Sequence, residues 1–187
     1  LKLREGETVA RTVNAETFLR QAVQVLVQRD EQVARPEMPV RWPALPGHQA
    51  SALRLALSRA LTERFAQNPK LGALQPKLRN YSKQSEFEYA GAMGGLVDRW
   101  GIPFAYGRIL GQCEEDHGQY DMPVYRPVFW ASGACLAVRL DAFWEVGGLD
   151  GDFFSHMEEI DLCWRMHRHG WAVEACSSST VRVVAPA

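Results

Sequence analysis

Hydrophobic and polar positions form their clearest pattern between residues 130 and 148. The run Trp130–Arg139 is apolar and short, which predicts a buried strand. Asp141 follows at a position suited to a helix N-cap, and the five residues after it fit about one and a half helical turns. Gly147 and Gly148 then end this short helix.

A second, longer helix is predicted after a loop that carries Asp150. Residues 155–158 read Ser-His-Met-Glu and match the S-x-x-E capping box that opens a helix. Gly170 closes that helix, and residues 171–175 alternate between apolar and polar positions as a strand does. The order strand, helix, loop, helix, strand predicts an α/β fold.

The first 67 residues have a weaker pattern. Residues 14–29 fit a helix with one apolar face, although alternating valines near their end argue for a strand; we favour the helix. Four prolines between residues 35 and 47 predict an extended linker. A regular apolar stripe predicts a helix over residues 48–67, which Asn68-Pro69 ends.

Charged residues gather in two further stretches. After a short buried strand over residues 71–74, the basic residues Lys77, Arg79 and Lys83 predict a solvated loop. Residues 114–121 are rich in acidic side chains and include His117. A metal site there would need about six convergent oxygens, so a solvated acidic loop is the favoured interpretation.

Composition narrows the class of protein. Of the 187 residues, 47% are hydrophobic, which is enough for one domain with a substantial core. A formal net charge of −1 argues against a nucleic-acid partner. No stretch has the pattern of a membrane span or a signal peptide. The four cysteines are scattered, which is typical of reduced thiols, so we expect a cytoplasmic protein.

The candidate chemistry lies in the first turn of the second helix. Glu158, Glu159 and Asp161 place three carboxylates within four positions. A helix N-terminus favours anions, and Asp161 can pair with Arg165 one turn later, so these charges have a purely structural interpretation. A carboxylate that faces a cleft there, crowded by its neighbours, would have a raised pKa and suit a general base.

The same residues carry a family resemblance. The runs GACLAVRLDAFWEVGGLDGDFF and HMEEIDLCWRMHRHGW resemble the C-terminal half of family-2 glycosyltransferases of the GT-A fold, a type common in bacterial cell-surface polysaccharide synthesis. The resemblance continues upstream through residues 68–77 and FEYAGAMGGLVDRWGIPFAYGR, and covers roughly residues 68–181. It implies an α/β fold with a partial GT-A-like, Rossmann-related mixed sheet flanked by helices.

The resemblance also implies a reaction. Such enzymes transfer a sugar from a nucleotide-sugar donor to an acceptor hydroxyl, here with inversion, on a glycan or lipid-linked acceptor, and with peripheral association to the inner membrane face. Glu159 falls on the family's catalytic base, with Glu158 beside it. The resemblance implies a donor and acceptor cleft lined by Asp150, Asp161, Trp130 and Gly133, with Trp130 or Trp164 as a sugar platform. Helical spacing favours a core position for Trp164. A divalent cation, Mg²⁺ or Mn²⁺, is expected, with ligands not identified.

The chain departs from the family before residue 68. The family's Asp-x-Asp metal motif has no counterpart there; the nearest candidate, Asp30, is followed two positions later by Gln32. We therefore divide the chain into a poorly matched helical and proline-rich segment, 1–67, and an acceptor and catalytic half, 68–187. Two alternatives remain. One is a non-catalytic remnant or interaction domain. The other is a metal-binding module built from His156, Glu159, Cys163 and His167.

Overall fold

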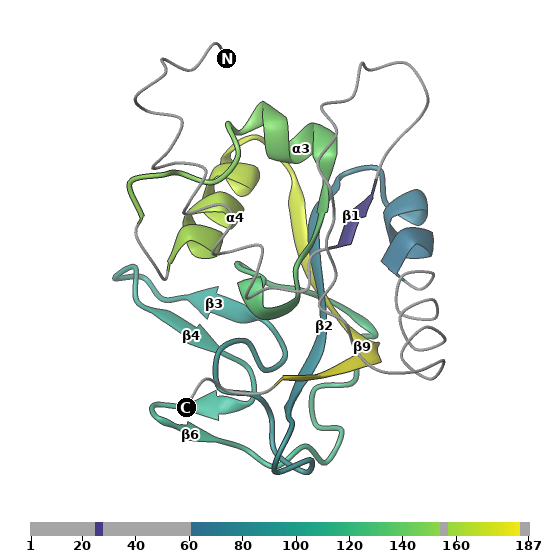
Figure 1. Cartoon of the computed structure of the whole chain (residues 1–187), viewed down its shortest axis with the longest axis vertical. Coiled ribbons are helices and arrows are strands. Elements are labelled where there is room, and N and C mark those ends of the chain that lie inside the picture. The colour runs from purple at the N-terminus through teal and green to yellow at the C-terminus, as the bar shows by residue number, and fades with distance from the viewer. Residues whose placement is uncertain (1–24, 28–60, 154–156, 184–187) are drawn as a thin grey trace.

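The computed structural model describes residues 25–27, 61–153 and 157–183. Within these ranges the chain forms two sheets, one of five strands in the order β1-β8-β2-β9-β7 and one of four strands in the order β3-β4-β5-β6 (Figure 1). Helices α3 (Leu140–Glu145) and α4 (Glu158–Arg168) cover one face of the larger sheet, and a helical segment over residues 61–67 lies against the other face. The mixed sheet flanked by helices is confirmed, and it is compatible with a partial GT-A-like fold.

Two long parallel strands form the centre of the larger sheet. Strand β2 (Leu71–Asn80) pairs with β9 (Ala172–Val183) along nearly its whole length. Both are longer than the sequence pattern predicts, because polar residues continue each strand beyond its apolar part. At the outer edges, β7 (Tyr125–Pro127) runs antiparallel to β9, while β8 (Ala137–Arg139) lies between β2 and β1 (Val25–Val27).

Strand β1 corrects one prediction. Residues 25–27 form a strand that pairs in parallel with β8, and the helix favoured over residues 14–29 is wrong at these positions. The alternation of valines was the better signal, because strands favour β-branched side chains. The other residues before 61 lie outside the described ranges, so the division of the chain at residue 67 stays a prediction.

The smaller sheet is a series of short antiparallel strands. It comprises β3 (Gly95–Val97), β4 (Pro103–Ala105), β5 (Arg108–Ile109) and β6 (Gln112–Cys113). Its attachment to the core depends on a glycine. The Trp130 ring lies where a side chain at position 95 would be, so that a Cβ on Gly95 would come within 1.7 Å of the ring.

The region between the sheet and α4 differs from its prediction. Only residues 137–139 of the predicted strand 130–139 form a strand, because Ser132 caps a short 3₁₀ helix, η1 (Gly133–Cys135). Helix α3 begins at Leu140, so Asp141 lies inside its first turn and does not cap it. The helix ends as predicted, since Gly147 and Gly148 both have positive φ.

Helix α4 begins two residues later than a capping box would place it. Its N-cap is Met157, with a φ of 74° and no capping side chain, so Glu158 is the first helical residue. Ser155 and His156 lie outside the described residues. The end of the helix is as predicted, with Gly170 at a positive φ. Among the described helices, none has the length and apolar character required to cross a bilayer.

Buried polar contacts fasten the helical segment 61–67 to the sheet. The Arg64 guanidinium donates two hydrogen bonds of 2.7 Å to the Glu174 carboxylate on β9. From the other side, the buried Arg139 side chain donates to the backbone carbonyls of Leu71 and Phe65. Because Phe65 is itself buried, this segment and the larger sheet share one hydrophobic cluster.

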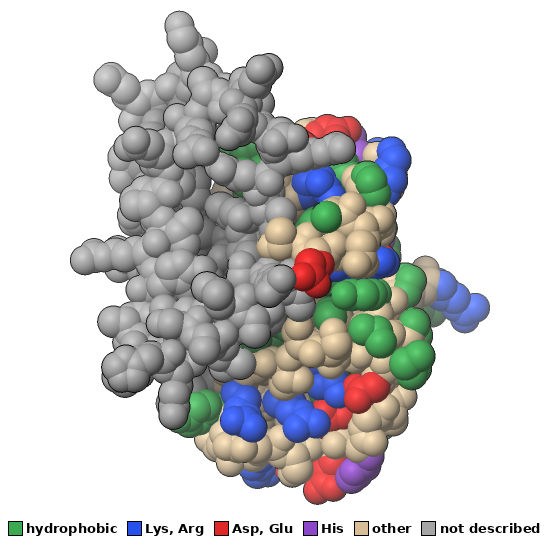
Figure 2. All heavy atoms as spheres, turned by 90° about the vertical axis from the view of Figure 1, so that its right-hand side faces the viewer, with side chains coloured by type: hydrophobic (Ala, Val, Ile, Leu, Met, Phe, Trp, Pro, Cys, Tyr) green, Lys and Arg blue, Asp and Glu red, His purple; other side chains and the backbone are tan. Residues whose placement is uncertain are grey.

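The predicted basic loop and the predicted acidic loop form one buried ion cluster. Lys77 lies on β2 with 3% of its side chain exposed, and its ammonium donates to Asp116 at 2.9 Å and to Asp121. The Arg79 guanidinium donates to the same Asp116 carboxylate, whose side chain is fully buried. The solvated-loop predictions are therefore wrong for Lys77, Arg79 and Asp116. On the face of the molecule shown in Figure 2, acidic and basic side chains of the described residues also lie close together.

Candidate functional site

The candidate site is organised by the contact between α4 and the segment before η1. On α4, the Nε2 atom of His167 lies 2.9 Å from the Phe129 carbonyl oxygen, and the buried Cys163 sulfur accepts from the Ala131 backbone N–H at 3.5 Å. These two helix positions are four residues apart, and their partners are two residues apart. One face of α4 therefore follows an extended backbone in the opposite direction.

Glu159 is the next residue along that face. Four helical residues rise about 6 Å and two extended residues span about 6.6 Å, so the same register brings Glu159 toward Gly133 at the start of η1. Burial raises the pKa of the Cys163 thiol to about 12, and the negative charge of Glu159 adds to this effect. The roles of Glu159 as the base and of Gly133 as a cleft residue stay predictions.

Glu158 presents an unusual carboxylate beside it. One of its oxygens, Oε2, is buried and accepts no hydrogen bond from any residue that the structure describes. A buried oxygen without a donor costs free energy on the order of 1–3 kcal/mol, more when it is charged. The positive end of the α4 dipole offsets part of this cost.

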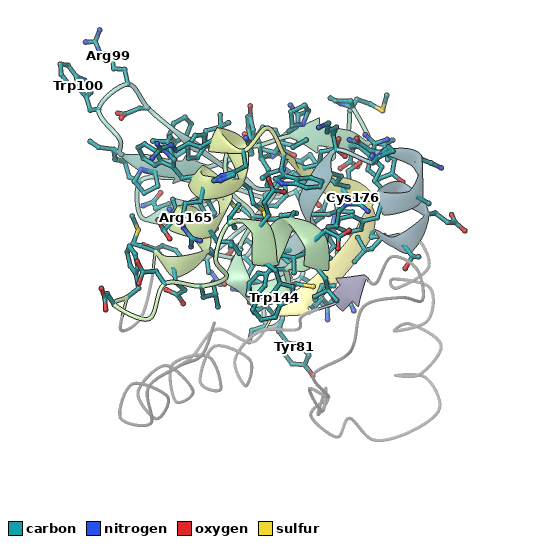
Figure 3. All side chains as sticks on the ribbon, turned by 90° about the horizontal axis from the view of Figure 1, so that it is seen from above. Tyr81, Arg99, Trp100, Trp144, Arg165 and Cys176 are labelled. Atoms are coloured by element: carbon teal, nitrogen blue, oxygen red, sulfur yellow. The ribbon has the colours of Figure 1, made fainter. Side chains whose placement is uncertain are left out.

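Asp161 and Arg165 connect the start of α4 to the glycine loop. The Arg165 guanidinium donates to the Asp161 carboxylate at 2.8 and 2.6 Å, which confirms the predicted pair. It also donates to the backbone carbonyls of Val146 and Gly148 at 2.6 and 2.7 Å. Arg165, labelled in Figure 3, therefore fixes the loop after α3 against α4, which gives Asp161 a positioning role.

A small open pocket lies against this junction. Its volume is about 230 Å³, and it is lined by Val146, Gly147, Leu149, Asp150, Gly151 and Arg165. Asp150 is an exposed residue of this lining, and its role in a substrate cleft stays a prediction. The Arg165 side chain supplies a positive charge to the same space.

The structure places Trp130 and Trp164 differently from the predictions made for them. Trp130 is 3% exposed, and its indole N–H donates to the Leu96 carbonyl at 3.0 Å, so both faces of the ring pack in the core. It is not available to a sugar. Trp164 is 48% exposed and stands edge-on to Phe129, with a centroid distance of 5.7 Å. The core position favoured for Trp164 is wrong, because the buried stripe of α4 consists of other positions, Ile160, Leu162, Cys163 and Met166.

One buried residue near η1 gave no sequence signal. The Gln75 side chain on β2 is fully buried; its Oε1 accepts from the Ser132 backbone N–H at 2.6 Å, and its Nε2 donates to the Gly91 carbonyl at 3.2 Å. It fixes the backbone just before Gly133. Its partners are 16 and 57 residues away in sequence, so no local pattern indicates this role.

The described residues do not form a metal site. No group of three or more His, Cys, Asp or Glu side chains among them could hold an ion. Cys163 and His167 bind to backbone groups instead, which argues against the metal-binding module; His156, its first proposed ligand, lies outside the described ranges. The described residues thus do not fit the divalent cation that the resemblance implies, and that cation stays a prediction.

Comparison with curated proteins identifies relatives of part of the chain. Over 115 residues, 60% of the chain, it is 51% identical to N-acetylglucosaminyl-diphospho-decaprenol L-rhamnosyltransferase from two strains of Mycobacterium tuberculosis. The chain spans 37% of the length of these relatives. No family model matches the chain. The resemblance to glycosyltransferases is therefore confirmed over this part of the sequence.

Proposed function

We propose that the chain provides the acceptor and catalytic half of a glycosyltransferase that acts in cell-wall glycan synthesis. The observation that carries the proposal is the pair of carboxylates, Glu158 and Glu159, at the start of α4, where Glu158 Oε2 is buried without a donor among the described residues. The 51% identity to a rhamnosyltransferase supports the same reaction class.

In the proposed reaction, Glu159 is the catalytic base. Its carboxylate takes the proton of the acceptor hydroxyl while that oxygen forms a bond to the anomeric carbon of the donor sugar. The bond from this carbon to the diphosphate oxygen breaks, and its electron pair leaves with the nucleoside diphosphate. Attack from the side opposite the leaving group inverts the anomeric centre. Glu158, the neighbouring carboxylate in the first turn of α4, keeps its Oε2 inside the protein and so leaves Glu159 as the carboxylate that meets the acceptor.

The remaining side chains position these groups. Asp161 acts through Arg165, which fixes the glycine loop, and Gln75 fixes the backbone before Gly133. Asp150 lines the pocket at the edge of this loop. We propose Trp164, in place of the buried Trp130, as the aromatic surface available to a sugar ring.

The relatives' name indicates the substrates to test. Their acceptor is N-acetylglucosaminyl-diphospho-decaprenol, and we propose a lipid-linked acceptor of this kind for the present chain. The donor is proposed to be a nucleotide-sugar, and the divalent cation is proposed to be Mg²⁺ or Mn²⁺. No step is assigned to the cation, because the described residues offer it no site.

Calorimetric titration of the purified chain with UDP and dTDP, with and without Mn²⁺, tests whether it holds a donor. Binding that depends on Mn²⁺ supports the proposal, and Glu159→Gln is expected to leave this binding unchanged. Absence of binding to either nucleotide, together with absence of transfer from a panel of nucleotide-sugars, would favour the non-catalytic alternative.

A further inference from the structure

The outer face of the smaller sheet is apolar and exposed. In the register of β3 and β4, Phe104 is opposite Leu96, and the next pair, Gly95 and Ala105, faces the core. Ala105 pairs with Arg108, so Ile109 lies on the same face as Phe104. Phe104 is 44% exposed and Ile109 is 64% exposed. This face continues into the β3–β4 and β5–β6 turns, which lie at the same end of the sheet because its consecutive strands are antiparallel.

Both turns carry a large apolar residue at the tip. Trp100, 74% exposed, lies in the turn between β3 and β4, followed by Ile102, which is 60% exposed. Asp98 holds this turn by accepting hydrogen bonds from the backbone N–H groups of both residues. Leu110, 93% exposed, lies in the turn between β5 and β6. We call the exposed set Trp100, Ile102, Phe104, Ile109 and Leu110 the hairpin patch.

The backbone conformation of Leu110 is a further sign that an apolar partner covers this turn. Leu110 has a φ of 54°, in the left-handed region that glycine and asparagine adopt most readily. A solvated turn would favour those residues. A leucine there is unfavourable both for the backbone and for its contact with water, unless an apolar partner covers it.

An arginine lies against the tryptophan at the tip of the patch. The Arg99 guanidinium stacks on the Trp100 ring at 4.7 Å from its centroid, and Figure 3 shows both side chains projecting from the molecule. Arg108 pairs with Ala105 on the inner side and donates to the Tyr89 carbonyl, so Arg99 is the cation that the patch presents. Tryptophan with an adjacent arginine is typical of side chains at the boundary between lipid headgroups and acyl chains.

The hairpin patch also reaches the candidate site. Trp130 occupies the inner side of β3 over Gly95, so alternation places Phe129 on the outer side with Leu96. Phe129 contacts Trp164 on α4, the helix that begins with Glu158 and Glu159. The hairpin patch therefore continues through Phe129 to Trp164, on the same helix as the two carboxylates.

We propose that the hairpin patch inserts into the interface of an anionic lipid bilayer and holds the carboxylates of α4 at the membrane surface. Trp100, Ile102 and Leu110 enter the apolar boundary, and Arg99 contacts lipid phosphates. The membrane insertion rests on the proposed function and deepens it, because a lipid-linked acceptor presents its sugar at the membrane surface. The residues of the hairpin patch are separate from the carboxylates of α4.

Co-sedimentation of the purified chain with vesicles tests the proposal. Vesicles of phosphatidylcholine with phosphatidylglycerol are compared with vesicles of phosphatidylcholine alone. The native chain is expected to bind the anionic vesicles, and the double variant Trp100→Ser, Leu110→Asn is expected to bind at least about tenfold more weakly. Asparagine suits the φ of residue 110, so the variant is expected to fold, and circular dichroism checks this. Arg99→Gln is expected to weaken only the binding to anionic vesicles.

The matched control is Trp144→Ser on α3. This tryptophan is 59% exposed and lies apart from Trp100 in Figure 3, so its loss is expected to leave vesicle binding unchanged. Absence of binding by the native chain, or equal binding by the double variant, would overturn the proposal. A dimer that the double variant abolishes, without vesicle binding, would assign the patch to a second copy instead. Vesicle binding needs no nucleotide-sugar, so its failure is distinguishable from a failure at Glu159.

Discussion

Replacement of Asp116 by asparagine is expected to destabilise the fold more than any other single change in the charged loops. The Asp116 carboxylate accepts from the Lys77 ammonium at 2.9 and 3.2 Å, from Arg79 Nε at 2.7 Å and from the Gly118 backbone N–H at 3.0 Å. Asparagine keeps the shape but removes the charge, and it turns an amide NH₂ donor toward two cations.

The magnitude follows from what remains around Lys77. Removal of one partner from a buried ion pair costs about 3–5 kcal/mol, because the other charge stays buried. Lys77 keeps Asp121, whose side chain is 47% exposed, and Arg79 is 30% exposed and can reach water. Both effects reduce the loss, so we expect a cost near the lower end, about 3 kcal/mol.

The loss of stability caused by Asp116→Asn is expected to depend on pH. Burial alone would raise the pKa of the Asp116 carboxyl, but hydrogen bonds from Lys77, Gly118 and Arg79 outweigh it and hold the pKa below the ordinary value of 3.8. A lowered pKa in the folded state contributes stability above the unfolded value, and this contribution is lost as the pH falls through the folded value. The difference between native chain and variant is therefore expected to be constant near neutral pH and to shrink below about pH 4.

Urea denaturation at pH 7 and at pH 3–4 measures both effects. The control is Glu115→Gln in the same loop; Glu115 is 60% exposed, and its contact with His117 is also at the surface, so a change within about 0.5 kcal/mol is expected. If Asp116→Asn unfolds within about 0.5 kcal/mol of the native chain at pH 7, the ion cluster does not carry the stability assigned to it.

Two other substitutions test the packing around the site. Gly95→Ala is expected to cost about 3 kcal/mol, because its Cβ would meet the Trp130 ring, whereas Gly111→Ala, with open space around it, is expected to be neutral by the same urea measurement. Arg165→Lys is expected to cost about 1–2 kcal/mol, since an ammonium cannot span the carboxylate and the two loop carbonyls that the guanidinium contacts. Unchanged unfolding of the Gly95 or Arg165 variant would contradict the corresponding contact.

Local signals predicted the elements that end at glycines. The ends of α3 and α4 follow from Gly147 and Gly170, because a positive φ is a property of the residue and its neighbours alone. The pair Asp161–Arg165 was predictable for the same reason, since helical spacing determines it. The start of α4 was not, because Met157 begins the helix without a capping side chain.

Long-range contacts explain what the sequence did not show. Lys77 and Arg79 look like loop residues until Asp116, 37 to 39 residues later, is placed against them. The exposure of Trp164 depends equally on which side of α4 packs against the rest of the protein. At the site, the motif indicated Glu159 and Asp150, whereas Gln75 and the orphan oxygen of Glu158 required coordinates.

Transfer of a radiolabelled sugar to a lipid-linked N-acetylglucosaminyl diphosphate tests the central claim most directly. UDP- and dTDP-sugars serve as donors, and the native chain is compared with Glu159→Gln. Loss of the base is expected to lower the rate about a hundredfold or more while nucleotide binding is retained. Transfer by Glu159→Gln at the native rate would contradict the assignment of Glu159 as the base.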